Sequence, residues 1–333
     1  MTTGGTNSSI IGASRAHDYR EHLHEHRTGQ DREEAERGYT ASLLKSLDTP
    51  YLTELYFHTS TASLRHNGPV RIPREPDMIT QDQKSFFHTF GYLFLPRLFN
   101  EEEMAVISER FDHWLDAERD DAPFPGESRQ SLYSIAELEP RFTDLVADDR
   151  IYNTVEALLG EGFLWLCSEG NLHVGAPQWH PAGTRLNYRP MKVPLYLDPL
   201  TADAGCLRVI PGSHRLPYHD DVRPIAQSDR PGTEIPSCLV ESKPGDVLFA
   251  DMNTWHASFG GHVGRRQLAV NFVPDPTSEV HVQMMKANYD GILRNIENLQ
   301  YSQPGRAFTD AFLQSENPRI SRLASKWVEL GLE

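Results

Sequence analysis

Short β-prone runs divided by turn residues are the feature of this sequence that most restricts its fold. They fill the region between residues 163 and 273, where Gly, Pro and Asp separate one run from the next. The runs are Phe163–Cys167, Asn171–Val174, Val193–Leu197, Leu207–Ile210, Val247–Phe249 and Gln267–Val273. Many short strands separated by turn signals are typical of a β-sandwich or jelly roll. We therefore predict a β core here.

Helical patterns flank this β region on both sides. Thr80–Phe90 has an amphipathic pattern that stops at Gly91, a residue that commonly ends helices. Asn100 and Glu103 are spaced as a capping box, which predicts a helix that runs to about Glu118. The other predicted elements are a strand at Tyr92–Leu95 and helical segments at 140–145, 151–159 and 284–333. The predicted fold class is α+β.

The first part of the chain has a different character. Residues 1–75 are polar and irregular, and helical spacing occurs only over Asp31–Leu47. We predict an N-terminal extension, residues 1–75, with one helix. A single domain, residues 76–333, then contains the β core and the C-terminal helices.

Composition limits the partners and the location of the protein. The chain has 32 Lys and Arg against 47 Asp and Glu, a formal net charge of −15, which disfavours a nucleic acid polymer as partner. No apolar run approaches the roughly 20 residues of a membrane span. The three cysteines are widely spaced, and the N-terminus lacks an apolar signal segment. We expect a cytoplasmic protein that acts on a small molecule, without a membrane partner.

Two Trp-His pairs are the strongest candidates for site chemistry. His180 and His256 each follow a tryptophan at the edge of a predicted strand, where side chains from distant segments can converge. Arg265 and Arg266 lead into the last predicted strand. An arginine that enters a closed β core is costly unless it meets a carboxylate, which its forked donors suit. This combination indicates a metal site with an anion-binding arginine beside it.

The order of these residues and of several flanking motifs resembles the phytanoyl-CoA dioxygenase family of iron(II)/2-oxoglutarate oxygenases. The similar segments are Gly91–Leu95, Phe99–Met104, Val193–Leu207, Val209–His214 and Lys243–Phe249, followed by His256 and the two arginines. The resemblance extends over residues 78–275. It implies a double-stranded β-helix, a cupin-like jelly roll, in agreement with the strand pattern.

The resemblance also implies roles for individual residues. His180 and His256 would bind Fe(II), and Arg265 would pair with the distal carboxylate of 2-oxoglutarate, with O2 as co-substrate. Arg265 is preferred to Arg266 because the resemblance, with Leu268–Val273 aligned to the family's strand, implies that Arg265 occupies the arginine position of the motif. Arg266 then points to the opposite face of the strand. Lys192 would make a further polar contact with 2-oxoglutarate.

The sequence departs from the family pattern at Ala182. Oxygenases of this family carry Asp or Glu two residues after the first histidine, completing a facial triad. Related halogenases carry Ala or Gly at that position, which leaves a place for a chloride ligand. The resemblance therefore implies a halogenase that chlorinates an unactivated aliphatic C–H bond in natural-product biosynthesis, with chloride beside Ala182.

Two alternatives stay open. The protein could be a hydroxylase with an unrecognised carboxylate ligand, or a catalytically inactive β-roll that only binds. Among the fifteen histidines, His-x-Asp/Glu occurs only at His219–Asp221, which we predict to be a surface loop. His173 is expected to line the pocket or to lie in the core, and His214 is expected to be structural.

The substrate is the least determined part of the prediction. Basic residues beside the core would suit an anionic free molecule, such as a deoxynucleotide monophosphate (deoxyadenosine monophosphate, for example). These residues are Arg185, Arg189, Lys192, Arg208 and Arg215. A substrate tethered to a carrier protein is the less favoured option.

Overall fold

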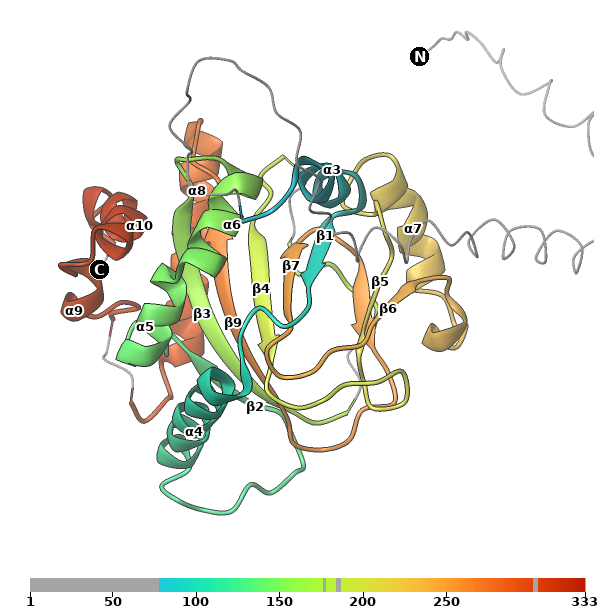
Figure 1. Cartoon of the computed structure of the whole chain (residues 1–333), viewed down its shortest axis with the longest axis horizontal. Coiled ribbons are helices and arrows are strands. Elements are labelled where there is room, and N and C mark those ends of the chain that lie inside the picture. Colours follow the sequence, from blue (N-terminus) through green and yellow to red (C-terminus); the bar gives the residue numbers. More distant parts are fainter. Residues whose placement is uncertain (1–77, 176–177, 184–186, 302–304, 333) are drawn as a thin grey trace, which may run out of the picture. The chain divides into compact units, whose positions relative to one another are not determined.

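A computed structural model describes residues 78–175, 178–183, 187–301 and 305–332 (Figure 1). The predictions for residues 1–75 lie outside this part of the chain. The helices are α3 (Gln81–Phe90), α4 (Glu101–Glu118), α5 (Pro140–Ala147), α6 (Asp149–Leu159), α7 (Tyr218–Ala226), η1 (Gly232–Glu234), α8 (Glu279–Ile296), α9 (Asp310–Leu313) and α10 (Pro318–Glu329). The strands are β1 (Tyr92–Leu95), β2 (Gln130–Tyr133), β3 (Leu164–His173), β4 (Met191–Tyr196), β5 (Leu207–Val209), β6 (Cys238–Val240), β7 (Val247–Asp251), β8 (His256–Ser258) and β9 (Arg265–Val273).

The strands form two antiparallel sheets, which confirms the predicted α+β class. The larger sheet has the order β1-β7-β4-β9-β3-β2, and the smaller has the order β6-β5-β8. An isolated bridge between His180 and His256 adds one more residue pair at β8. After β3 the chain passes to this bridge and returns to the larger sheet at β4. The next two strands, β5 and β6, pair in the smaller sheet, and β7, β8 and β9 then lie in the larger, the smaller and the larger sheet in turn.

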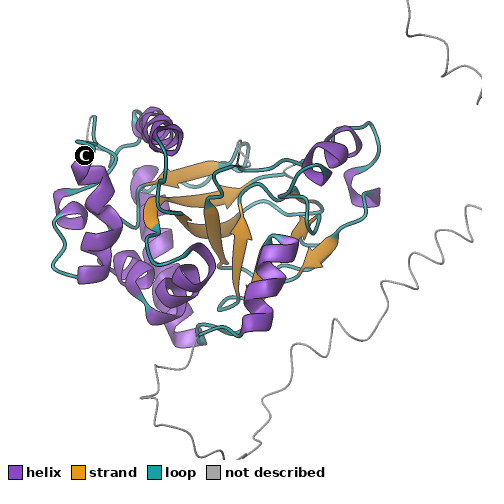
Figure 2. Ribbon diagram, turned by 90° about the horizontal axis from the view of Figure 1, so that it is seen from above, coloured by secondary structure: helices purple, strands orange, loops and turns teal. Residues whose placement is uncertain are grey.

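Side-chain alternation gives the larger sheet two different faces. In β4 and β9, the apolar core contains Val193, Leu195, Leu268, Val270 and Phe272. The residues between them point to the other face, because the period of a strand is two residues. Figure 2 shows most helices gathered on one side of the strands. None of the described helices combines the length and the apolar character that a membrane crossing needs.

The predicted helix boundaries before the β core are confirmed. Thr80 and Gln83 form a capping box at the start of α3, and Gly91 ends this helix with a φ of 82°. Asn100 and Glu103 form the second capping box, at the start of α4. Each box satisfies backbone N–H groups that the helix itself leaves without acceptors.

The predicted break between the first two strands is wrong. Phe163–Cys167 and Asn171–Val174 were expected as separate strands, but β3 runs through both, with Gly170 inside it. A Cβ on Gly170 would lie 2.7 Å from Cε2 of Phe111 in α4. The glycine therefore allows the helix to approach the strand closely and does not mark a turn.

The predicted surface loop around His219 is also wrong. Residues 218–226 form α7, which buries His219, Val222 and Ala226 at helical spacing and leaves Asp221 exposed. Pro224 is tolerated because it removes only one hydrogen bond near the end of a short helix. The His219 Nδ1 is 2.8 Å from the Ser213 carbonyl oxygen, so this histidine is a packed structural residue.

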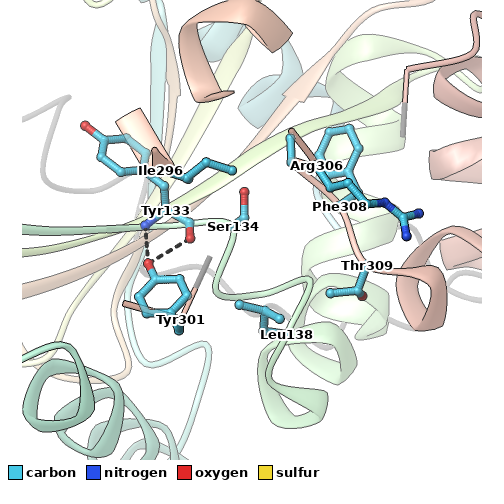
Figure 3. A pocket seen from close by; sticks show the side chains of 9 residues that line it. Tyr133, Ser134, Leu138, Ile296, Tyr301, Arg306, Phe308 and Thr309 are labelled. Carbon is cyan, nitrogen blue, oxygen red and sulfur yellow. Dashed lines mark hydrogen bonds between the residues drawn. The ribbon is translucent and has the colours of Figure 1, made fainter. Parts of the chain in front are cut away.

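The C-terminal segment is tied to the β core by side-chain hydrogen bonds. The Tyr301 hydroxyl accepts from the Tyr133 amide (2.8 Å) and donates to the Tyr133 carbonyl (2.9 Å), as Figure 3 shows. The Thr309 hydroxyl donates to the Glu137 carbonyl at 2.8 Å. Trp327 Nε1 donates to the Trp165 carbonyl at the same distance. These bonds place α8, α9 and α10 against β2 and β3.

Glu137 is a buried carboxyl group at this junction. Its side chain accepts hydrogen bonds from Trp165 Nε1 at 2.9 Å and from the Ser168 hydroxyl at 2.5 Å. Burial raises the pKa of Glu137 to about 7, and these hydrogen bonds offset only part of that increase. The folded protein therefore keeps this proton at pH values where an unfolded chain has lost it.

The pKa of Glu137 predicts how stability depends on pH. The unfolded chain releases this proton near pH 4.5 and the folded protein near pH 7, so the stabilisation is complete below the first value and lost above the second. This loss is about 3 kcal/mol. Glu137→Gln should remove that part of the decline, measured by urea unfolding at pH 5 and pH 8. An unchanged pH dependence in the variant would contradict this assignment.

Candidate active site

A pocket of about 1000 Å³ lies between the two sheets. Its walls come from β3, β4, β7 and β9 of the larger sheet and from β5 and β8 of the smaller one. A second pocket, of about 290 Å³, lies beside Tyr133, Ser134 and Tyr301 (Figure 3). The residues described around that second pocket include no histidine, cysteine or carboxylate. The pocket between the sheets is therefore the candidate active site.

His180 and His256 meet in this pocket although they are far apart in sequence. Each backbone N–H donates to the other residue's carbonyl at 3.0 Å, and the two ring centroids are 4.5 Å apart. The Nδ1 atoms lie 2.6 Å from the Gln178 carbonyl and 2.8 Å from the Thr254 carbonyl. Because these acceptors require protonated Nδ1 atoms, both Nε2 lone pairs are available to a metal.

The electrostatics of the pocket keep His256 neutral. Burial, and after it the neighbouring His180, lowers the pKa of His256 to about 3. A neutral imidazole with a bonded Nδ1–H is the form that ligates iron. The two histidines thus fit the protein part of an iron site.

Ala182 lines the same pocket, two residues after His180. Within the described residues, no group of three or more His, Cys, Asp and Glu side chains is placed to hold a metal. A methyl group cannot coordinate a metal. A metal held by His180 and His256 would therefore take its other ligands from outside these side chains.

Arg265 and Arg266 point to opposite sides of β9. Arg265 is only 4% exposed and lines the pocket. Its guanidinium donates to the Gly205 carbonyl (2.8 Å), the Ser258 hydroxyl (2.9 Å) and the Gly175 carbonyl (2.7 Å). Arg266 instead pairs with Asp112 and Asp198 outside the pocket, at 2.7 and 2.8 Å. Arg265 is therefore the arginine that can receive a carboxylate in the pocket.

Two glycines bring the backbone directly against the Arg265 guanidinium. A Cβ on Gly205 or on Gly261 would overlap the guanidinium atoms, and Gly205 also has a φ of 78°. A side chain at either position would displace the arginine. The guanidinium is thus held by main-chain atoms on two sides.

Lys192 lines the pocket and forms an ion pair there. Its Nζ lies 2.5 Å from Oε1 of Glu169, a residue of β3 that sequence reasoning missed. Burial has the largest single effect and raises the pKa of Glu169, but the Lys192 charge together with hydrogen bonds from Lys192, Asn271 and Asn171 holds that pKa below its ordinary value. Asp251, the second carboxylate in the lining, pairs with Arg189 at 2.5 Å.

Most of the basic residues predicted to attract an anionic substrate have other partners. Arg189 and Lys192 are in ion pairs, and Arg215 donates to the His88 carbonyl. Arg208 packs over the Phe259 ring and is not part of the pocket lining, and Arg185 lies outside the described residues. The predicted cluster is therefore not a shared anion site in the described structure.

Arg129 is a pocket cation that the sequence analysis did not identify. It precedes β2, lines the pocket, is exposed, and forms no ion pair with a described residue. His173 also lines the pocket. Burial, followed by the charges of Arg265 and Arg129, lowers the pKa of His173 to about 4.

One sequence signal could have revealed part of this lining. Glu169, Asn171 and His173 alternate with other residues along β3, and all three line the pocket. Polar residues at every second position of an otherwise buried strand indicate a pocket-facing side. Arg129 lies in an irregular segment, where no such pattern exists. His214 is buried, with Nε2 3.3 Å from the His88 carbonyl, and lies outside the lining.

Comparisons with known proteins find similar enzymes among curated proteins and solved structures. Two ectoine dioxygenases, from Bordetella bronchiseptica and Bordetella parapertussis, are each 24% identical to this chain in an alignment 217 residues long, and the match covers 55% of this chain and 70% of theirs. Similar solved structures include HygX from Streptomyces hygroscopicus with nickel and 2-oxoglutarate bound (19% identity, TM-score 0.48, covering 59% of this chain and 87% of HygX). Another is EctD from S. alaskensis with bound Fe (23% identity, TM-score 0.48, covering 62% and 82%).

The family assignment rests on the profile of phytanoyl-CoA dioxygenase (PhyH). This profile matches residues 87–266, more than half of the chain. The match runs from α3 to β9 and includes both histidines, Ala182 and Arg265. The chain therefore belongs to the phytanoyl-CoA dioxygenase family of iron- and 2-oxoglutarate-dependent oxygenases.

Proposed function

We propose that this protein is an iron(II)/2-oxoglutarate-dependent halogenase that chlorinates an unactivated aliphatic C–H bond of a free small molecule. The reaction would take place inside a double-stranded β-helix. One observation carries the proposal: His180 and His256 face each other in the pocket, while the position two residues after His180 holds the methyl group of Ala182.

The proposed roles follow from the chemistry of each side chain. His180 and His256 would hold iron through their Nε2 atoms, and Arg265 would receive the distal carboxylate of 2-oxoglutarate. When bound, iron and 2-oxoglutarate with O2 would supply the oxidant that removes a hydrogen atom from carbon, and chloride would supply the halogen. The protein's part is to orient the target carbon toward the halide and to exclude water.

Charge supports chloride as the missing ligand. In the usual facial triad, the third protein ligand is a carboxylate that adds one negative charge to the two neutral imidazoles. Chloride carries the same charge and would occupy the space that Ala182 leaves. Arg265 is buried, and the guanidinium donates there to neutral oxygen atoms of Gly175, Gly205 and Ser258. A buried guanidinium of this kind favours an anionic partner such as 2-oxoglutarate.

A hydroxylase is the second candidate, because the named relatives are dioxygenases. The hydroxylase hypothesis requires a protein carboxylate as a ligand to iron. Glu169 and Asp251 line the pocket, but each would have to leave the cation that it now pairs with. The cost of breaking those pairs favours the halogenase.

For the substrate we propose an anionic molecule, with a deoxynucleotide monophosphate as the leading case. Arg129 is the cation that supports this choice, since it lines the pocket and is exposed to an entering ligand. Arg129 takes the role of anion binding that the sequence analysis gave to the cluster of basic residues.

Ala182→Asp tests the proposed halogenation. The wild type should give chlorinated product only when chloride is present, with a panel of free molecules that includes deoxyadenosine monophosphate. Ala182→Asp should reduce chlorination more than tenfold, because a carboxylate excludes chloride by charge and by occupancy. Ala182→Gly keeps the vacant position and should stay active. Mass spectrometry of the products measures the outcome. A wild type that forms hydroxylated product whether or not chloride is present would overturn the proposal. A wild type that binds neither iron nor 2-oxoglutarate would indicate a binding module.

Arg265→Ala should weaken 2-oxoglutarate binding by about thirtyfold or more, since loss of a buried charge pair costs about 2–5 kcal/mol. Arg266→Ala is the matched control. It should leave this affinity unchanged and lower the melting temperature, because it removes the pairs with Asp112 and Asp198. Anaerobic calorimetry with the Fe(II) protein measures the affinity. The reverse order of the two variants would show that Arg266 serves the pocket.

Arg129→Gln should weaken binding of deoxyadenosine monophosphate by about tenfold and leave deoxyadenosine unaffected. Arg230→Gln, an exposed arginine outside the pocket lining, is the control. Equilibrium binding to the Fe(II)·2-oxoglutarate protein gives both affinities. Equal binding of nucleotide and nucleoside by the wild type, or no binding of either, would exclude the nucleotide.

A further inference from the structure

The pocket contains carboxylates that could compete for the metal, and each is matched by a cation. Glu169 pairs with Lys192, and Asp251 pairs with Arg189, both at 2.5 Å. Lys192 and Glu169 have side chains that are 20% and 22% exposed. They share the pocket wall with His180, His256 and Ala182.

The pair spans three strands of the larger sheet. Glu169 lies in β3 and Lys192 in β4, and β9 runs between these strands. Asn271 of β9 donates to the same Oε1 of Glu169, at 3.3 Å. The Glu169 carboxylate is thus drawn across β9 toward β4.

The pair faces the same cavity as the two histidines, because Glu169, Lys192, His180 and His256 all line it. A glutamate tethered in the same cavity has a high effective concentration at any metal held by His256. A carboxylate oxygen is also a ligand that iron accepts readily.

We propose that Lys192 is a positioning residue that holds Glu169 away from the metal position beside Ala182, and so keeps that position open to chloride. The inference rests on the proposed function. It gives Lys192 a different task from the 2-oxoglutarate contact expected from the sequence. It also explains how a pocket that contains a glutamate can lack a third protein ligand.

The first experiment measures metal affinity without halide. Co(II) is titrated into the full chain with 2-oxoglutarate in chloride-free buffer, for the wild type and for Lys192→Met. The variant should bind Co(II) at least about tenfold more tightly, because Glu169 then becomes a ligand. Lys192→Arg keeps the cation and should match the wild type. Equal affinity in Lys192→Met and wild type would overturn the proposal.

Two double variants separate coordination from simple attraction between charges. Glu169→Gln with Lys192→Met removes the carboxylate and should return the affinity to the wild-type value. Glu169→Asp with Lys192→Met keeps the charge on a shorter side chain and should lose most of the gain. If the aspartate variant keeps the full gain, Lys192 acts only through its charge and the proposal is wrong. Lys192→Gln replaces Lys192→Met if melting curves show that the methionine variant does not fold.

A chloride titration of the same proteins tests the proposed function separately. Chloride should change the visible Co(II) spectrum of the wild type saturably. Lys192→Met should need at least about tenfold more chloride for the same change, and the glutamine double variant should recover the wild-type response. A wild type without any response would refute the halogenase, while the affinity measurements would still decide the role of Lys192.

Discussion

The bridge between His180 and His256 is the interaction on which the candidate site depends. Two backbone hydrogen bonds of 3.0 Å join residues from segments that are separated by most of the β core. Each such bond contributes only about 0.5–1.5 kcal/mol to stability. Its larger effect is geometric, because residues directly opposite each other in a bridge place their side chains on the same face. The bridge therefore sets the spacing of the imidazoles before any ligand arrives.

The charges around the histidines are arranged so that anions have defined places. Glu169 and Asp251 are neutralised by protein cations, whereas Arg265 is buried against neutral oxygen atoms and Arg129 is exposed without a described ion pair. Burying a charge without an opposite charge is costly, and this cost supports the proposal that an anion binds at Arg265. The proposed division, with the cosubstrate at Arg265 and the substrate anion at Arg129, follows from this difference in burial.

Local signals in the sequence were sufficient for the helices before the β core, and they singled out His180 and His256, which the structure brings together. The capping box at Asn100 is determined within four residues. The family resemblance chose Arg265, and strand alternation separates it from Arg266. The errors came from contacts between distant segments. The expected turn between Phe163–Cys167 and Asn171–Val174 is absent because Gly170 lies inside β3, with Phe111 packed against it. The expected surface loop is α7, which buries His219. Likewise, Lys192 could not be assigned its partner Glu169, because a third strand lies between them.

The two glycines against Arg265 bear on how enzymes of this design can diversify. Where side chains enclose an arginine, single mutations change the space around it. Such mutations can then change which dicarboxylate the arginine binds. Here main chain forms that wall, and main chain moves only together with the turns that carry it. Descendants of this chain would therefore retain one cosubstrate while the side-chain-lined end of the pocket near Arg129 changed. Selection could then broaden the range of substrates without altering the source of oxidising power.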